Sequence, residues 1–370
     1  MKKTGDFVFE LGKESDDTYL RALLAKNAMP GGIRVAFHSE PDYRSYLGIQ
    51  GKHNQVIAVK EKGSGRIVGF GTRSIKPAYV NGNIENIGYL SNLRSEEEYR
   101  CGSLLVRGYR YLAELHKDGR VPFYISTIIE ENNYAKDILT SNRCGLPVYE
   151  DRGLYFTNAI IIGRGKKESD IEITRGSAER IGDILGCLNR NGKMKQFYPY
   201  YDKADFESGS GYLKGICAED FYIATEGHKI VGVAAKWDQS GFRQLVIEGY
   251  SAGMGVLRSV YNFLAPIFKF SKLPPRGLPL KMLYVGFIAV DNNEPSIFRA
   301  ILRTIYNNAV STGYQCILVG MHSSDPLREV MREYAHFKYL SRLYVVRWGS
   351  EADNEVKIDG RIPYLEIGAL

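Results

Sequence analysis

Residues 84–119, IENIGYLSNLRSEEEYRCGSLLVRGYRYLAELHKDG, predict a strand that leads through a short polar loop into a helix. The strand covers 84–94 and the loop 95–102. The apolar helix positions recur at the spacing of one buried face: Leu104, Leu105, Gly108, Tyr109, Leu112 and Leu115.

The start of the predicted helix is a candidate anion site. The first N–H groups of such a helix have no partner within it, and the helix dipole adds positive charge there. Gly102 allows close approach to the backbone, and Arg100 can pair with phosphate oxygens. The junction predicts a site for a diphosphate-bearing cofactor; the alternative is an ordinary strand–helix junction with a capped helix.

Further elements are predicted on both sides of this junction. Residues 56–71 form a hairpin with its turn at Gly63-Ser64-Gly65. Residues 121–146 contain another strand, followed by a helix that begins at Asn132 or Asn133. Residues 147–162 predict two closing strands on either side of Asp151-Arg152-Gly153.

This order of elements resembles that of the GNAT-superfamily N-acetyltransferases. The strand at 84–94 corresponds to the fourth strand of that family, and the strand that begins at 121 corresponds to the fifth. The resemblance rests on Arg-x-Gly (100–102) after the fourth strand and on Asn-x-x-Ala (132–135) at the start of the helix that follows the fifth. It covers most of the first 165 residues. In that family the loop after the fourth strand normally reads Arg/Gln-x-x-Gly-x-Gly/Ala. Here it reads Glu98-Tyr99-Arg100-Cys101-Gly102-Ser103, so the spacing is shortened or shifted.

The resemblance implies acetyl-CoA, or another acyl-CoA, as co-substrate and no metal. It assigns the acyl-CoA site to the fourth strand, the following loop and the next helix start: Asn92, Leu93, Arg94, Arg100, Cys101, Gly102, Ser103, Leu104 and Asn132. A backbone N–H near Asn92 or Leu93, where the fourth strand bends away from the fifth, is expected to stabilise the oxyanion of the tetrahedral intermediate.

Acyl transfer to an amine also needs a base that removes a proton from the attacking nitrogen. Glu85 is the candidate, because GNAT enzymes often place a glutamate early on the fourth strand. Glu130 and Glu131, at the end of the fifth strand, are the alternatives. The tyrosine that serves many family members as general acid is replaced here by Leu139, with Tyr134 one turn away.

The second half of the chain repeats this order of elements. A hairpin at 222–236 and a strand at 283–291 correspond to the first hairpin and the fourth strand, followed by a helix at 295–312, a strand at 316–322, a helix at 326–334 and a strand at 339–348. We therefore expect two tandem GNAT-like domains of mixed α/β (α+β) class, at 1–165 and 166–370, joined near 163–170. Each is expected to have a largely antiparallel central sheet flanked by helices. An insertion of about 239–280 carries an apolar helix-like run at 256–270 and a Pro/Gly-rich linker.

The second junction is predicted to bind no cofactor. It reads Asp291-Asn292-Asn293-Glu294-Pro295, which brings negative charge toward a diphosphate and has no glycine. Asp, Asn and Pro are instead typical of a helix start.

The composition is that of a globular chain, with 44% hydrophobic residues and a net charge of +7. It contains no apolar run of the roughly 20 residues that a membrane helix needs, and its first residues do not form a secretory signal. The five cysteines are odd in number and form no Cys-x-x-Cys motif. This pattern argues against a disulfide framework and against a structural zinc site. We expect a cytoplasmic protein with no membrane contact and without nucleic acid as its main partner.

The expected activity is acyl transfer from acyl-CoA to the primary amine of a small molecule or peptide, by direct attack in a ternary complex. Two alternatives remain. Fem-type aminoacyltransferases are also tandem GNAT-like folds but use aminoacyl-tRNA, and the chain could instead be a non-catalytic acyl-CoA-binding protein. The oligomeric state is not predicted.

Overall fold

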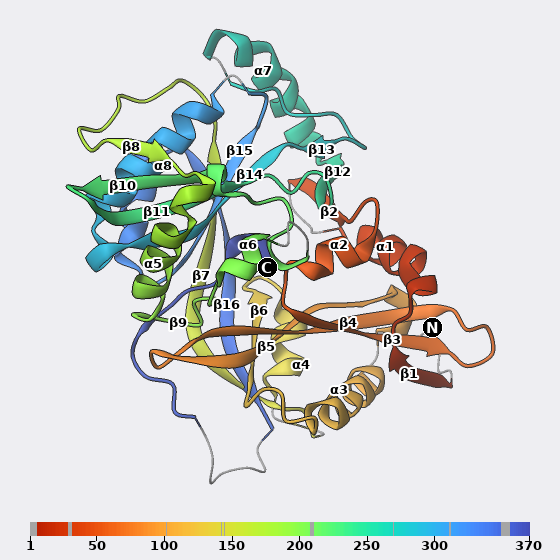
Figure 1. Cartoon of the computed structure of the whole chain (residues 1–370). Helices are drawn as coiled ribbons and strands as arrows, with labels where there is room; N and C mark the ends of the chain where they lie inside the picture. The colour runs from red at the N-terminus through yellow and green to blue at the C-terminus, as the bar shows by residue number, and fades with distance from the viewer. Residues whose placement is uncertain are drawn as a thin grey trace.

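A 12-stranded sheet extends through both halves of the chain (Figure 1). The computed structural model describes residues 6–28, 32–100, 102–141, 143, 145–207, 211–268, 270–310, 312–348 and 356–370. The strands follow the order β1-β3-β4-β5-β6-β16-β7-β15-β14-β11-β10-β8. Their bounds are β1 Phe7–Leu11, β3 His53–Glu61, β4 Ile67–Val80, β5 Asn83–Ser95, β6 Tyr124–Ile129, β7 Val148–Ile161, β8 Ile173–Arg175, β10 Phe221–Glu226, β11 Lys229–Trp237, β14 Met282–Val290, β15 Cys316–His322 and β16 His336–Arg347.

The sheet is largely antiparallel, as the sequence predicted. Within the described residues, the large sheet has parallel pairing only between β5 and β6 and between β14 and β15. These two pairs occupy corresponding places in the two halves, which confirms the predicted fold class and the repeat of elements.

The prediction of two closing strands in residues 147–162 is wrong. This segment is one continuous strand, β7. Gly153 takes a positive φ of 98°, which glycine allows, and the strand continues through this residue without a turn. The register against β16 shifts at this point, between Arg342 and Tyr344. The strand beside β6 is β16, which comes from the second half of the chain.

The two halves therefore exchange strands. β16 lies between β6 and β7, and β7 lies between β16 and β15, so that each half contributes a strand to the sheet of the other. The predicted boundary near 165 falls in the connection between β7 and β8. As a division into domains it stays a prediction, because a single sheet runs across it.

Helices cover both faces of the sheet in the N-terminal half. α1 (Asp17–Lys26) and α2 (Tyr43–Gly48) lie on one face and α3 (Gly102–His116) on the other (Figure 1). Leu20, Leu24, Tyr43 and Tyr46 pack with Phe70 beneath α1 and α2. On the other face Tyr109 and Leu112 of α3 pack with Leu90 and Tyr124, and α4 (Asn133–Leu139) adds Leu139 to this cluster.

The second half is built around α5 (Ile181–Gly192) and α8 (Pro295–Ala309), whose buried residues join the largest core cluster. α6 (Lys203–Glu207) follows α5, and β9 (Lys195–Gln196) pairs in parallel with β17 (Ile362–Pro363). The residues after β17 run into the interior: Tyr364, Leu365 and Ile367 are all buried. The chain end accordingly lies near the centre of the molecule (Figure 1).

The segment at 239–280 forms β12 (Gln244–Tyr250), α7 (Ala252–Phe268) and β13 (Pro279–Leu280). β12 pairs with β13 and with β2 (Ile33–His38) of the N-terminal half. A second, three-stranded sheet therefore also joins the halves. No helix within the described residues is both long enough and apolar enough to cross a bilayer.

Candidate functional site at the divergence of two parallel strands

The parallel strands β5 and β6 separate in the middle of the N-terminal half. They pair at three positions, from Gly88 with Tyr124 to Leu90 with Ser126. Beyond these positions β5 continues to Ser95 along β4, and β6 continues to Ile129 along β16. Among the described residues no strand pairs with the edge of β5 that faces β6 from Ser91 onward, and its backbone groups can bond an extended ligand.

A bulge in β5 marks the point of divergence. Asn92 has a φ of 53°, and the register against β4 skips so that Asn92 and Leu93 lie opposite the single residue Gly71. Asparagine tolerates this left-handed conformation better than most residues do. The bend predicted at Asn92 and Leu93 thus has a defined structural cause.

A network of polar side chains from three elements holds the bulge. Tyr46 of α2 donates its hydroxyl hydrogen to Asn92 Oδ1 over 3.2 Å and accepts a hydrogen bond from Gln50 Nε2. Asn92 Nδ2 donates to Ser91 Oγ over 3.2 Å, and Ser91 Oγ donates to Gln50 Oε1 over 2.8 Å. Thr72 Oγ1 of β4 lies 2.6 Å from Ser91 Oγ. This network was not predicted, because Tyr46, Gln50 and Thr72 are far from Asn92 in the sequence.

The N-terminus of α3 follows β5 after a 3-10 turn at Glu97–Tyr99. Its first turn contains no acidic residue. Ser103 is exposed and Leu104 is buried in a cluster with Tyr99, so the backbone of the first turn is anchored beside solvent. Gly102 is the first residue of the helix, and the predicted site residue Cys101 lies outside the described residues. A 15-residue helix with this start can attract an anion.

Two arginines lie between the bulge and the helix. Arg94 is partly buried, and its Nε has no hydrogen-bond partner among the described residues. Burial lowers the pKa of Arg94, and the nearby charge of Arg100 acts in the same direction. Arg100 is exposed and donates from Nη2 to Asn27 Oδ1 over 2.9 Å. Arginines that precede a helix N-terminus in the chain favour a phosphate group there.

Apolar side chains are exposed on either side of the divergence. Leu93 of β5 is 47% exposed and Ile129 of β6 is 42% exposed. Tyr339, on the neighbouring strand β16, is also exposed. Grouped exposed apolar residues are typical of a surface that a ligand covers.

The structure does not bring Glu85 to the divergence. It is exposed near the start of β5, opposite Ala78, while Asn92 lies seven positions further along. At the rise of a strand these residues are roughly 20 Å apart.

Glu130 and Glu131 lie at the end of β6, on the diverging side. Arg342 donates from Nε and Nη2 to the Glu130 carboxylate over 2.9 and 3.0 Å, and Lys136 lies 3.4 Å from it. The hydrogen bonds from Arg342 lower the pKa of Glu130, so that it is ionised but a weak proton acceptor. Glu131 is exposed. Asn132 caps α4, its Oδ1 accepting from Ala135 N over 3.1 Å, as predicted for the start of this helix.

Two buried titratable residues were not singled out from the sequence. Lys76 of β4 is 3% exposed, and its Nζ lies 5.8 Å from the centre of the Tyr89 ring. Burial lowers the pKa of Lys76 to about 8, against the attraction of Glu366. Burial also raises the pKa of Glu366. A lysine among apolar strand residues was the available signal, but its partner near the chain end could not be identified from sequence.

The corresponding divergence of β14 and β15 in the second half is occupied by the chain itself. Phe287 has a φ of 54°, as Asn92 does in β5, and the parallel pairing ends at Val285 with Val319. The Phe287 N–H donates to Glu366 Oε2 over 2.7 Å, and the Ile288 N–H donates to the Tyr364 hydroxyl over 3.1 Å. The chain's own last residues thus satisfy the backbone groups beyond this second bulge.

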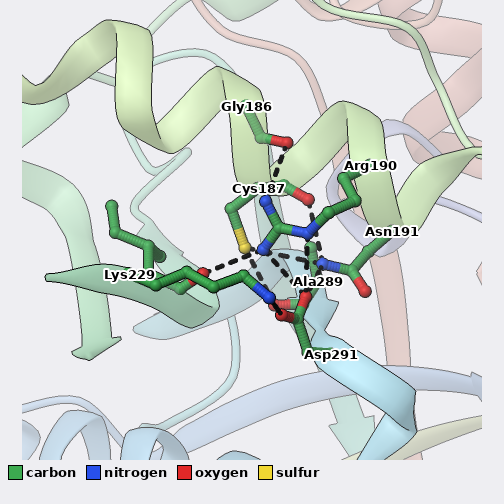
Figure 2. Close-up of polar contacts among 8 residues, drawn as sticks. Gly186, Cys187, Arg190, Asn191, Lys229, Ala289 and Asp291 are labelled. Carbon is green, nitrogen blue, oxygen red and sulfur yellow. Dashed lines mark hydrogen bonds and ion pairs between the residues drawn. The ribbon is translucent and has the colours of Figure 1, made fainter. Parts of the chain in front are cut away.

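The second junction also holds a cluster of charges (Figure 2). Asp291 accepts from Arg190 Nη2 over 2.8 Å, from Asn191 Nδ2 over 2.8 Å and from Lys229 Nζ over 2.7 Å. Although burial acts to raise it, these hydrogen bonds lower the pKa of Asp291. In the same view Cys187 points toward Ala289, and burial raises the pKa of its thiol to about 11.

Glu294 is the N-cap residue of α8. Its Oε1 accepts from the Ser296 N–H over 3.2 Å and from Ser296 Oγ over 2.9 Å, and Pro295 follows at the first helical position. A carboxylate therefore occupies the helix N-terminus where an anion would bind, and the absence of a cofactor at this junction stays a prediction. Within the described residues no group of three or more His, Cys, Asp or Glu side chains is placed to hold a metal ion.

Solved structures share this architecture. The chain aligns with Saccharomyces cerevisiae N-myristoyltransferase with bound myristoyl-CoA at 11% identity and a TM-score of 0.59, covering 98% of this chain and 89% of that one. It aligns with a GCN5-related N-acetyltransferase from Sphaerobacter thermophilus at 10% identity and a TM-score of 0.56, covering 98% of each chain. A GCN5-related glucosamine N-acetyltransferase region of a fungal GH3 β-N-acetylglucosaminidase gives a TM-score of 0.60 at 12% identity, covering 93% of this chain and 38% of that one.

No protein-family model and no curated protein matches the sequence. The likeness is one of structure, and it extends over both halves of the chain. The order of the elements, and a β5 strand that bends away from β6, agree with the resemblance stated from the sequence. The chain therefore has the GNAT-superfamily fold.

Proposed function

We propose that the protein is an acyl-CoA-dependent N-acyltransferase with one acyl-CoA site per chain, at the divergence of β5 and β6. The observation that carries this proposal is the contrast between the two divergences. Beyond the first, no described strand pairs with the free edge of β5, and the start of α3, whose first turn has no acidic residue, and two arginines follow it in the chain. Beyond the second, Tyr364, Glu366 and Glu294 already bond the backbone groups that a ligand would use.

The proposed binding mode assigns each part of acyl-CoA to a different feature. The amide-bearing arm would bond the unpaired edge of β5, and the diphosphate would lie at the start of α3 with Arg94 and Arg100. Leu93 and Ile129 offer apolar contact near the bulge. That contact suits acetyl and longer acyl groups alike, so both belong in the assay.

In the proposed reaction the acceptor amine attacks the thioester carbonyl carbon directly. A carbon–nitrogen bond forms, the carbonyl oxygen becomes an oxyanion near the N–H groups of Asn92 or Leu93, and the carbon–sulfur bond then breaks. The nitrogen loses one proton to a base, and the departing CoA thiolate takes up a proton. The acceptor is proposed to be the primary amine of a small molecule or peptide.

The base is proposed among the three glutamates. Glu85 remains the candidate from the family resemblance, whereas Glu131 lies on the diverging side and, unlike Glu130, is in no ion pair with Arg342. Replacing the true base by glutamine should lower kcat by roughly 10²–10⁴-fold while acyl-CoA affinity is kept. Glu85→Gln, Glu130→Gln and Glu131→Gln, measured side by side, identify it. If all three keep the wild-type rate, the amine loses its proton before it binds.

The activity is tested by a thiol-release screen, in which acetyl-CoA and myristoyl-CoA are each mixed with a panel of small-molecule amines and peptide N-termini. Amine-dependent release of CoA is expected. Tight acyl-CoA binding without release by any amine would favour the non-catalytic binding protein. Absence of acyl-CoA binding together with transfer from aminoacyl-tRNA would favour the Fem-type alternative.

A further inference from the structure

Helix α7 presents its apolar face to solvent. The exposed apolar side chains recur at helical spacing along one side: Val256, Leu257, Val260, Phe263, Leu264 and Ile267. Phe263 is 78% exposed and Val256 is 68% exposed. A surface helix of a globular domain normally turns such a face toward the core, so the orientation of α7 is the reverse of the usual one.

The polar face of α7 fixes this orientation. Asn262 Nδ2 donates to Leu273 O over 3.0 Å, and the Leu273 N–H donates back to Asn262 Oδ1 over 2.8 Å. Arg258 Nε donates to the same carbonyl over 3.2 Å, and the Tyr261 hydroxyl donates to Ser271 O over 3.2 Å. Since these bonds hold the polar side against the loop that follows, the helix cannot turn its apolar side inward without breaking them.

The charged residues of the segment that carries α7 are all basic. Between Glu248 and Asp291 the sequence contains no acidic residue but carries Arg258, Lys269, Lys272, Arg276 and Lys281. Lys272, Arg276 and Lys281 are exposed. None of these three forms an ion pair within the described part of the chain. The helix lies at the outer end of the molecule, away from the divergence of β5 and β6 (Figure 1).

We propose that α7 binds the surface of an anionic lipid bilayer, its apolar face entering the headgroup region while the neighbouring lysines and arginines contact lipid phosphates. An exposed apolar helix face in a segment whose charges are all basic suits an interfacial helix. The inference does not depend on the proposed acyltransferase activity. It departs from the expectation of no membrane contact, because an interfacial helix lies on the bilayer and does not span it.

Vesicle flotation of the full chain tests this proposal. Vesicles of phosphatidylcholine with an equal part of phosphatidylglycerol should carry the protein to the top of the gradient, and phosphatidylcholine alone or high salt should reduce the bound fraction. The double variant Phe263→Ser, Ile267→Ser should lower the affinity roughly tenfold or more. Tyr19→Ser with Met194→Ser, which removes two exposed apolar side chains elsewhere, should leave binding unchanged.

A second pair of variants tests the charges. Lys272→Glu with Arg276→Glu should abolish the preference for phosphatidylglycerol, whereas Lys167→Glu with Lys193→Glu, the same change at two exposed lysines elsewhere, should not. Because all replaced side chains are exposed, thermal melts should show that every variant folds. Absence of flotation, or equal flotation of the Phe263 and Ile267 variant, overturns the proposal. So does sedimentation equilibrium showing a dimer that this variant dissociates while no vesicle binding occurs, since a second copy would then cover α7.

Discussion

Asn92 is the residue on which the candidate site depends most directly. Its left-handed backbone and its amide group, bonded to Tyr46 and Ser91, together hold the bulge. Asn92→Ala should destabilise the fold by about 1–2 kcal/mol more than Asn92→Gly, because alanine disfavours a positive φ and glycine does not. Urea denaturation of both variants measures the difference.

The Asn92→Ala and Asn92→Gly variants also distinguish the effect of backbone strain from the effect of losing the side-chain hydrogen bonds. Asn92→Gly relieves the backbone but removes the amide, so it should still weaken acyl-CoA binding if the network positions the bulge. Equal stability of the alanine and glycine variants would contradict the assigned backbone conformation.

Lys76 should make stability depend on pH. Burial lowers its pKa to about 8, from the ordinary value of 10.5. Between these two pH values the unfolded chain holds the proton more tightly, so the stability contributed at Lys76 rises with pH. Lys76→Met should therefore be more stable than wild type by up to about 3 kcal/mol below pH 8, and this advantage should shrink toward zero as the pH rises to the ordinary value.

The measurement is denaturant unfolding of both proteins from pH 7 to 10. Lys338→Met, a change at an exposed lysine, is the control and should show no such trend. A difference between Lys76→Met and wild type that stays constant with pH would show that Lys76 is not a desolvated cation in the folded chain.

The sequence placed some candidate residues on the right elements and missed others for a physical reason. Strand and helix patterns correctly placed Asn92, Leu93 and Arg94 on β5, and Gly102, Ser103 and Leu104 on α3. Gln50 and Glu366 act through contacts between distant segments, which periodicity cannot reveal. The role of Glu85 stays a prediction, although its place on the strand is distant from the bulge.

Among the elements, strand β7 is the one whose course differs from the prediction. Asp151-Arg152-Gly153 looks like a turn in sequence, because aspartate and glycine favour turns. In the structure β16 pairs along both sides of this point, and Gly153 is a bend within one strand. The hydrogen-bonding partner of β7 here is β16, which belongs to the other half of the chain. The local sequence of β7 contains no signal of this pairing.

Gly153→Val should accordingly be strongly destabilising. Its φ is 98°, and an added Cβ would lie 2.8 Å from Nε2 of His322, which is itself fixed by contacts to Ser324 and the Arg152 carbonyl. A loss of about 2–4 kcal/mol is expected from strain and overlap together. Gly63→Ala, at a glycine with open space around it, should change the unfolding free energy by less than about 1 kcal/mol. Comparable losses in both variants would contradict this account of β7.

For the whole molecule, strand exchange predicts that the halves stay together after the connection between them is cut. Arg164 and Lys167 are exposed between β7 and β8, so trypsin should cleave there. Because β16 lies between β6 and β7, the two fragments should co-elute in gel filtration and separate only in denaturant. Separation in native buffer would show that the halves are independent domains, as the sequence alone suggested.

The central claim is that one of two similar divergences binds acyl-CoA. Isothermal titration calorimetry of the full chain with acetyl-CoA and with myristoyl-CoA tests it most directly. The account predicts one site per chain, lost in the Arg100→Ala, Gly102→Asp double variant, because aspartate repels the diphosphate at the start of α3. Binding should be kept in Lys229→Ala at the second junction. Two equivalent sites, or full affinity in the double variant, would contradict it.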